Sequence, residues 1–152
     1  MKKLLFGLVL VLSGAVCAEP QLTGTWQSER ELSMRFTRKH IKLEPKTIAF
    51  LEQIWGDLTL EFGRGRVISR MPDVETTNAV GVISKLMGFS ETRPLNVVAI
   101  TPDQIATVSK EPVTGRNHIT VYNFEDADTM WVYVGTANLA GMDIREYFVR
   151  VK

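Results

Sequence analysis

Short segments of alternating apolar and polar residues, separated by turn signals, make up most of this chain after residue 57. Alternation with a period of two is the pattern of a strand with one buried face. The links between segments contain Gly, Pro or Asp and are short enough for hairpins. Residues 72–91 fit no single pattern, and we interpret them as one short strand and an irregular loop. The other strands that we expect after residue 57 lie at 58–62, 67–71, 95–100, 105–109, 118–124, 130–134 and 144–151.

Hairpins that follow one another along a chain form an antiparallel meander, and closing the meander into a barrel removes its exposed edges. We therefore expect an all-β fold, an antiparallel up-and-down barrel of about eight strands. A barrel of this size has room inside for packed side chains or for one small ligand.

The alternation starts earlier, at residues 22–36, and predicts one long, bent first strand. This parity puts Ser28 and Arg30 on the inward face of the strand. A buried charge needs a partner, so Arg30 requires a carboxylate, a bound anion or water there. The alternative is a bulge that turns Arg30 outward. The apolar even-numbered positions on which the strand rests are Leu22, Gly24, Trp26, Leu32, Met34 and Phe36.

One segment, at about residues 45–55, follows the helical period instead. Pro45 suits a first helical turn and Gly56 suits a helix end. This amphipathic helix comes between the first and second strands, where it can cover the open mouth of the barrel. It either plugs the barrel and completes the core, or forms a lid over a cavity. In the second case its apolar arc faces a ligand with Phe50, Leu51, Ile54 and Trp55, and Arg30 supplies a polar contact.

The N-terminus has the composition of a cleavable export signal. Lys2 and Lys3 precede an apolar run that is too short to span a bilayer, and cleavage is expected after Ala18. The mature chain, 19–152, is then expected to form a single domain without a thiol or a transmembrane segment. The short lysine-led signal is typical of bacteria and predicts a periplasmic or secreted protein; the alternative is a lipoprotein acylated at Cys17.

Charge argues against a general nucleic-acid-binding role. Loss of Lys2 and Lys3 leaves 16 basic residues against 17 acidic ones, whereas binding to a phosphate backbone requires a basic excess. Basic residues do crowd the stretch from Arg35 to Lys46, which is either a solvated face or a docking site for an anionic lipid or an acidic protein. Its members are Arg35, Arg38, Lys39, His40, Lys42 and Lys46.

No set of residues for catalysis or metal binding is recognisable, so we expect neither enzymatic activity nor a cofactor or metal. The mature chain has no Cys and no Gly-x-Ser-x-Gly motif. Its histidines, His40 and His118, are too few for a zinc site at suitable spacing. Asp126 and Asp128 lack the Gly and the distal Glu of a calcium loop, and we interpret them as a tight turn.

The opening Gly24-x-Trp26, the mature length and the meander resemble the lipocalin or broader calycin superfamily. In that family the Trp of the first strand closes one end of the barrel beneath an Arg or Lys from near the last strand. The resemblance therefore gives such a role to Gly24 and Trp26, with either Arg145 or Arg150 as the covering residue. The chain departs from the typical lipocalin pattern because its main helix follows the first strand instead of the barrel.

Together these features predict an exported lipocalin-like protein that binds a small apolar or amphipathic ligand in the barrel. Its expected ligand-binding residues are Arg30, Phe50, Leu51, Ile54 and Trp55. The alternative is a non-enzymatic periplasmic interaction protein with a filled barrel, such as an inhibitor of an exported enzyme or an envelope-stress factor. That protein would dock through the basic stretch from Arg35 to Lys46.

Overall fold

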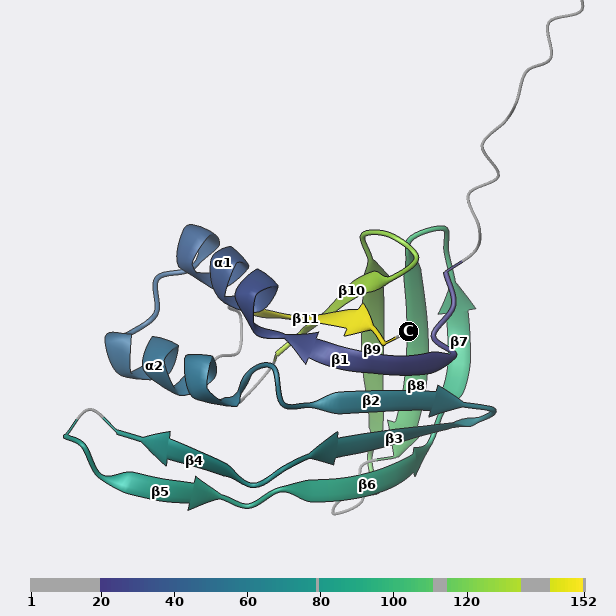
Figure 1. Ribbon diagram of the computed structural model, residues 1–152. Helices are drawn as coiled ribbons and strands as arrows, with labels where there is room; N and C mark the ends of the chain where they lie inside the picture. The colour runs from purple at the N-terminus through teal and green to yellow at the C-terminus, as the bar shows by residue number, and fades with distance from the viewer. Residues whose placement is uncertain (1–19, 79, 111–114, 135–142, 152) are drawn as a thin grey trace, which may run out of the picture.

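Antiparallel strands form one large sheet that curls into a nearly closed barrel (Figure 1). The computed structural model describes residues 20–78, 80–110, 115–134 and 143–151 of the 152-residue chain. Within these ranges the sheet has nine strands in the order β6-β3-β2-β1-β11-β10-β9-β8-β7. The expected all-β antiparallel barrel is therefore confirmed. Its strands are β1 (Gly24–Glu29), β2 (Thr59–Gly63), β3 (Arg66–Met71), β6 (Phe89–Pro94), β7 (Asn96–Ile100), β8 (Gln104–Lys110), β9 (Asn117–Phe124), β10 (Thr129–Tyr133) and β11 (Arg145–Arg150).

The two end strands of the sheet, β6 and β7, follow each other directly in the chain. β6 pairs with β3 and β7 pairs with β8, yet only Leu95 separates β6 from β7 in the chain. The backbone N–H of Leu95 donates a hydrogen bond of 2.9 Å to the carbonyl of Gly65. The two ends of the sheet are thus consecutive segments of one polypeptide, which brings them together at this end of the barrel.

A second, two-stranded sheet occupies part of the ambiguous stretch 72–91. Here β4 (Val74–Thr77) and β5 (Ile83–Leu86) prolong the β3 and β6 strands beyond the barrel (Figure 1). The chain bends tightly at this point: a Cβ on Gly88 would lie 2.5 Å from the carbonyl oxygen of Met71. Gly88 therefore allows the two strands to approach each other closely.

The prediction of a long first strand reaching residue 36 is wrong. The strand ends at Glu29, and residues Arg30–His40 form helix α1. The Glu29 carboxylate caps this helix by accepting a 2.5 Å hydrogen bond from the N–H of Leu32. Basic residues in the last helical turn suit the negative end of the helix dipole. The one helix that was expected, at about residues 45–55, is present as α2 (Pro45–Ile54).

Two groups of apolar side chains hold the molecule together. The smaller group joins the helix pair to the barrel and consists of Met34, Leu51, Trp55 and Ile144. The larger group fills the barrel end opposite the helices, and we call it the base. Its buried members are Leu22, Trp26, Leu60, Phe62, Val67, Leu95, Ile105, Tyr122, Met130 and Phe148. Neither α1 nor α2 has the length and apolar character needed to cross a membrane, and the described residues contain no other helix.

Candidate functional site

The base of the barrel is closed by Trp26 and Arg150. The Trp26 side chain is fully buried, and the Arg150 guanidinium lies over its ring, 4.2 Å from the centroid. Arg150 also donates hydrogen bonds of 2.6 and 2.8 Å to the carbonyls of Thr23 and Gln21. Of the two arginines considered from sequence, Arg150 is therefore the one that covers Trp26. Gly24 leaves room for it, because a Cβ there would lie 3.0 Å from Arg150 Nη1 and the backbone φ is 122°.

Arg145 lies elsewhere, on the outer surface of the barrel. Its guanidinium is 3.9 Å from the ring centroid of Trp131 and 4.2 Å from that of Phe36 on α1. The Asp143 carboxylate accepts two hydrogen bonds of 2.9 Å from it. Arg145 thus helps to attach α1 to the barrel wall.

Strand register shows which side chains point into the barrel. Arg93 on β6 lies opposite Val67, and Glu91 lies opposite Ser69. Partners directly across an antiparallel pair share one face of the sheet. Because Val67 and Ser69 are buried on the inner face, Arg93 and Glu91 face the barrel interior.

Exposure rises steadily along this inner face of β6. Leu95, at the base, is 8% exposed. The side chains of Arg93 and Glu91 are 30% and 35% exposed, and Phe89 at the far end is 46% exposed. On this strand, the inward-facing side chains are therefore packed at the base and increasingly open to water with distance from it.

A polar belt lies directly above the packed base. Arg93 Nε is buried and has no hydrogen-bond partner among the described residues, and it lies 3.6 Å from a carboxylate oxygen of Glu91. Tyr122 on β9 is close enough to feel the charge of Arg93. Burial raises the pKa of Tyr122 to about 12, against smaller lowering effects of Arg93, Thr107 and Thr120. Tyr122 therefore keeps its proton and can donate a hydrogen bond.

Glu146 lies on the opposite wall, because β11 is four strands from β6 in the sheet order. Its side chain is buried between Ile144 and Phe148 on the inner face. The hydroxyl of Ser28 donates a 2.6 Å hydrogen bond to Oε1 of Glu146 and accepts one of 3.0 Å from the N–H of Gly56. Desolvation raises the pKa of Glu146 to about 7, although the Ser28 hydrogen bond opposes this shift.

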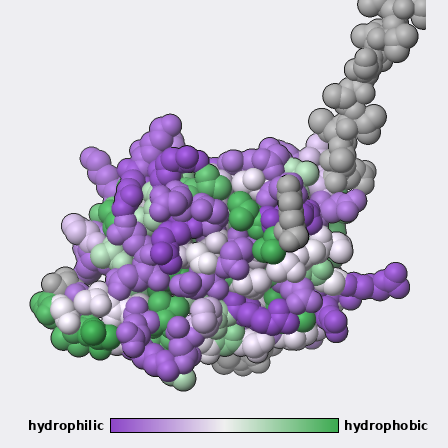
Figure 2. All heavy atoms as spheres, in the orientation of Figure 1, coloured by the Kyte–Doolittle hydropathy of each residue, from purple (hydrophilic) through white to green (hydrophobic). Residues whose placement is uncertain are grey.

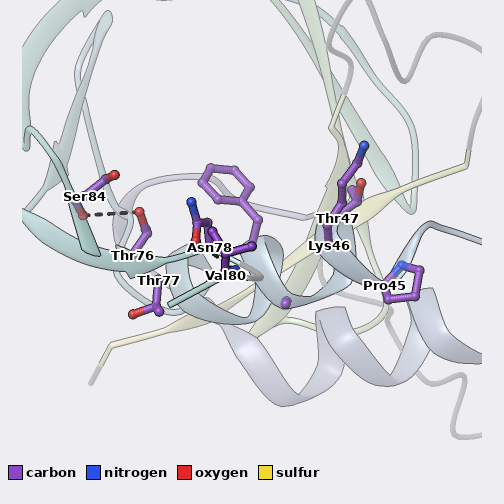
Figure 3. Close-up of a pocket in the computed structure, with 10 residues that line it drawn as sticks. Pro45, Lys46, Thr47, Thr76, Thr77, Asn78, Val80 and Ser84 are labelled. Atoms are coloured by element: carbon purple, nitrogen blue, oxygen red, sulfur yellow. Dashed lines mark hydrogen bonds between the residues drawn. The ribbon is translucent and has the colours of Figure 1, made fainter. Parts of the chain in front are cut away.

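An open groove of about 720 Å³ lies between α2 and the β4–β5 hairpin. Figure 3 shows Thr76 and Ser84 on the hairpin side and Pro45, Lys46 and Thr47 on the helix side. Figure 2 shows hydrophobic side chains gathered around the tip of this hairpin, at the lower left of the view. The exposed apolar residues at the tip are Val80, Val82 and Ile83.

The structure separates the residues expected to bind a ligand. Phe50, 42% exposed, lines the groove. Leu51 and Trp55 are buried in the contact between helices and barrel, and Ile54 packs against that cluster. Arg30 begins α1, so the prediction that it faces inward from a strand is wrong. Its Nε donates a 2.6 Å hydrogen bond to the Trp55 carbonyl, and its charge lies 3.8 Å from Asp57.

The basic stretch from Arg35 to Lys46 covers the end of α1 and the link to α2. Two of its charges are compensated locally: Arg38 pairs with Glu52, and Lys46 pairs with Glu44 at 2.8 Å. Cys17 and the signal segment lie outside the described residues.

Sequence reasoning missed Glu91, Arg93 and Glu146. The strand alternation contained a signal for each of them. Glu91 and Arg93 share the parity of Leu95, and Glu146 shares the parity of Ile144 and Phe148. A charged residue in register with buried apolar neighbours is expected to face inward.

No group of three or more His, Cys, Asp or Glu side chains that could hold a metal ion occurs in the described part of the chain. Comparison of the sequence and structure with known protein families, curated proteins and solved structures gives no match. The function must therefore be inferred from the geometry of the barrel itself.

Proposed function

We propose that this chain is an exported binding protein that holds one small amphipathic molecule inside the barrel. The proposal rests mainly on the inward-facing side chains of β6, which stay open to water above a packed base. Ligand sites are concave, mainly apolar, and contain a few polar groups that orient the ligand. The belt of Arg93, Glu91 and Tyr122 supplies such polar groups, and Phe89 supplies apolar surface beside them.

The groove between α2 and the β4–β5 hairpin is the proposed access route. It is lined by apolar as well as polar side chains, among them Phe50 and Val80. The Gln53 side chain on α2 attaches the hairpin by exchanging two hydrogen bonds with the backbone of Thr77. Movement at this attachment would widen the groove without disturbing the base.

Export is proposed from the sequence, because the first 18 residues have the composition of a bacterial signal peptide. We place the mature protein in the periplasm or outside the cell. Within the barrel, the belt offers groups that can recognise a ligand. Among the described residues it contains no nucleophile with an adjacent base, so a binding role suits it better than a catalytic one.

Native mass spectrometry of the mature protein, purified gently from its own host, tests the proposal. We expect a bound species of a few hundred daltons. Substitution Ser84→Trp should fill the groove and reduce the bound fraction. Ile83→Trp is the matched control, because Ile83 is the next residue on β5 and points to the opposite face. A folded wild-type protein that carries no ligand and takes up none from a lipid extract would contradict the proposal.

A second candidate is a protein-binding role, which the exposed strand β7 favours. β7 lies at one end of the sheet order, and Val97, Val98 and Ile100 are each more than half exposed. An apolar strand at a sheet end can pair with a strand of another protein. If a partner is recovered from the periplasm, Val98→Asp should abolish its capture and leave ligand binding unchanged.

A further inference from the structure

We propose that the ligand is a single-tailed amphiphile with a carboxylate head group, and that Arg93 binds this carboxylate deep in the barrel. This inference rests on the proposed function, since it specifies the chemistry of a molecule held in the same interior. It concerns the order in which polar and apolar groups follow one another along the β3–β6 wall of the barrel.

The sorting has three levels. The base is apolar and packed. The belt above it contains the guanidinium of Arg93 and the hydroxyl of Tyr122. On the β3–β6 wall apolar side chains return beyond Glu91, because Phe89 lies opposite Met71 on the inner face and Phe50 lines the groove beyond. A molecule that matches this order has its polar end innermost and its apolar tail directed towards the helices.

Arg93 is the group in the belt with unsatisfied binding capacity. A guanidinium stays charged at any physiological pH and has five N–H donors. Its Nε is buried without a hydrogen-bond partner among the described residues, and leaving a buried donor unpaired is unfavourable. Its ionic partner, Glu91, is 3.6 Å away, beyond good hydrogen-bond distance. A carboxylate can accept two parallel hydrogen bonds from a guanidinium and would satisfy this donor.

The position of Glu91 explains how a ligand anion can be admitted. Glu91 is nearer the mouth than Arg93 and is 35% exposed. Its carboxylate can therefore turn into water when another carboxylate takes its place beside Arg93. This exchange predicts that the two neighbours act in opposite directions: Arg93 favours an anionic ligand, and Glu91 opposes it.

Glu146 on the far wall attracts a cationic ligand less strongly than Arg93 attracts an anionic one. Its carboxyl is buried with Ser28 as a hydrogen-bond donor, and desolvation favours its uncharged form. Glu91, the other acid of the inner wall, is already engaged with Arg93. Within the described residues, the Arg93 guanidinium is therefore the cationic group of the belt, and its buried Nε has no hydrogen-bond partner.

Isothermal titration calorimetry tests the inference with three probes of equal tail length, namely dodecanoate, dodecanol and dodecylamine, each below its solubility limit and below any micelle concentration. A hydrogen bond to a charged group corresponds to a roughly 10- to 100-fold change in affinity. We expect dodecanoate to bind tighter than dodecanol by a factor in this range. Dodecylamine should bind most weakly.

Substitutions should then separate the head-group contact from the tail contact. Arg93→Met should lower the affinity for dodecanoate to that for dodecanol and leave dodecanol unchanged. Arg93→Lys should keep part of the preference for the acid, and Glu91→Gln should tighten dodecanoate binding a few-fold. Arg70→Met is the matched control, because Arg70 forms a similar pair with Glu61 at 2.7 Å on the outer face. Circular dichroism verifies that each variant is folded.

Two results would overturn the inference. Equal affinity of the wild-type protein for acid and alcohol would remove the carboxylate contact but leave the binding function intact. Tighter binding of dodecylamine would assign recognition to Glu91 and Glu146 instead. If no probe binds and the protein also carries no ligand in native mass spectrometry, the proposed function fails together with the inference.

Discussion

The buried carboxyl of Glu146 makes the stability of this protein depend on pH. Its pKa is raised from an ordinary value of 4.5 to about 7, mainly because burial disfavours the charged form. Between these two values the unfolded chain has lost the proton and the native state has kept it. The free energy of unfolding therefore falls as pH rises through this window, by about 1.4 kcal/mol per pH unit and about 3 kcal/mol in total.

The substitution Glu146→Gln isolates this effect. Glutamine has nearly the shape of the protonated acid and its oxygen can still accept the hydrogen bond from Ser28, but it cannot ionise. At pH 4.5 the variant should be less stable than the wild type by about 1 kcal/mol, because its buried amide has an unpaired donor. At about pH 8 it should be more stable by about 2 kcal/mol, since the wild type must then ionise a buried group.

Urea denaturation followed by tryptophan fluorescence at several pH values measures the difference. Glu61→Gln is the control, because the Glu61 carboxylate lies exposed on the outer face of the barrel. A difference in stability between Glu146→Gln and the wild type that stays constant across the pH range would refute the reasoning. It would mean that water or movement of β11 solvates the carboxylate in the native state.

Three further substitutions test the base and the attachment of α1, each by chemical denaturation. Arg150→Met should destabilise the protein by about 2 kcal/mol, because Trp26 loses a cation–π contact and two backbone carbonyls lose their donor. Gly24→Ala should cost about 1–3 kcal/mol, since it forces a side chain into a positive-φ conformation; no loss would mean that the chain rearranges there. Ser33→Ala should cost about 1–3 kcal/mol, because the buried N–H of Tyr147 loses its acceptor at 2.8 Å, and an unchanged midpoint would argue against docking of α1 through this bond.

The hairpins of the barrel could be predicted from sequence because each has one buried face. The strands expected at 58–62 and 67–71 correspond to β2 and β3, and the pairs that became β7–β8 and β9–β10 were also expected. The β4–β5 hairpin was not defined in advance. Its strands have largely exposed residues on both faces, so no apolar alternation marks them.

Helix α1 was mistaken for strand because a short apolar set fits two periods. Leu32, Met34 and Phe36 are spaced by two, yet Leu32 and Phe36 are also one helical turn apart. The buried face of the helix includes Ser33 and Thr37, which are polar and gave no apolar signal. Capping by Glu29 and packing against β11 decided the outcome.

The candidate site was predictable in part. The closing role of Trp26 and the helix at 45–55 were expected. The sequence could not show whether Arg145 or Arg150 covers Trp26, because both lie on the last strand. Helical spacing also could not show which apolar residues at the α2 end face the groove and which face the core. Phe50 faces the groove, whereas Leu51 and Trp55 face the core. That division depends on the β4–β5 hairpin, which the sequence did not reveal.

The pairing of the first strand with the last has a consequence for how the chain acquires its structure during synthesis. β1 lies between β2 and β11, and Arg150 is 127 positions along the chain from Thr23, whose carbonyl it binds. Contacts between such distant residues slow folding, because a long loop must close first. While the ribosome is still making the C-terminal strand, β1 lacks one neighbour and Trp26 lacks its cover. The nascent chain is therefore expected to stay open until strand β11 emerges, and such a delay would suit the proposed export, because a membrane translocon requires an unfolded chain.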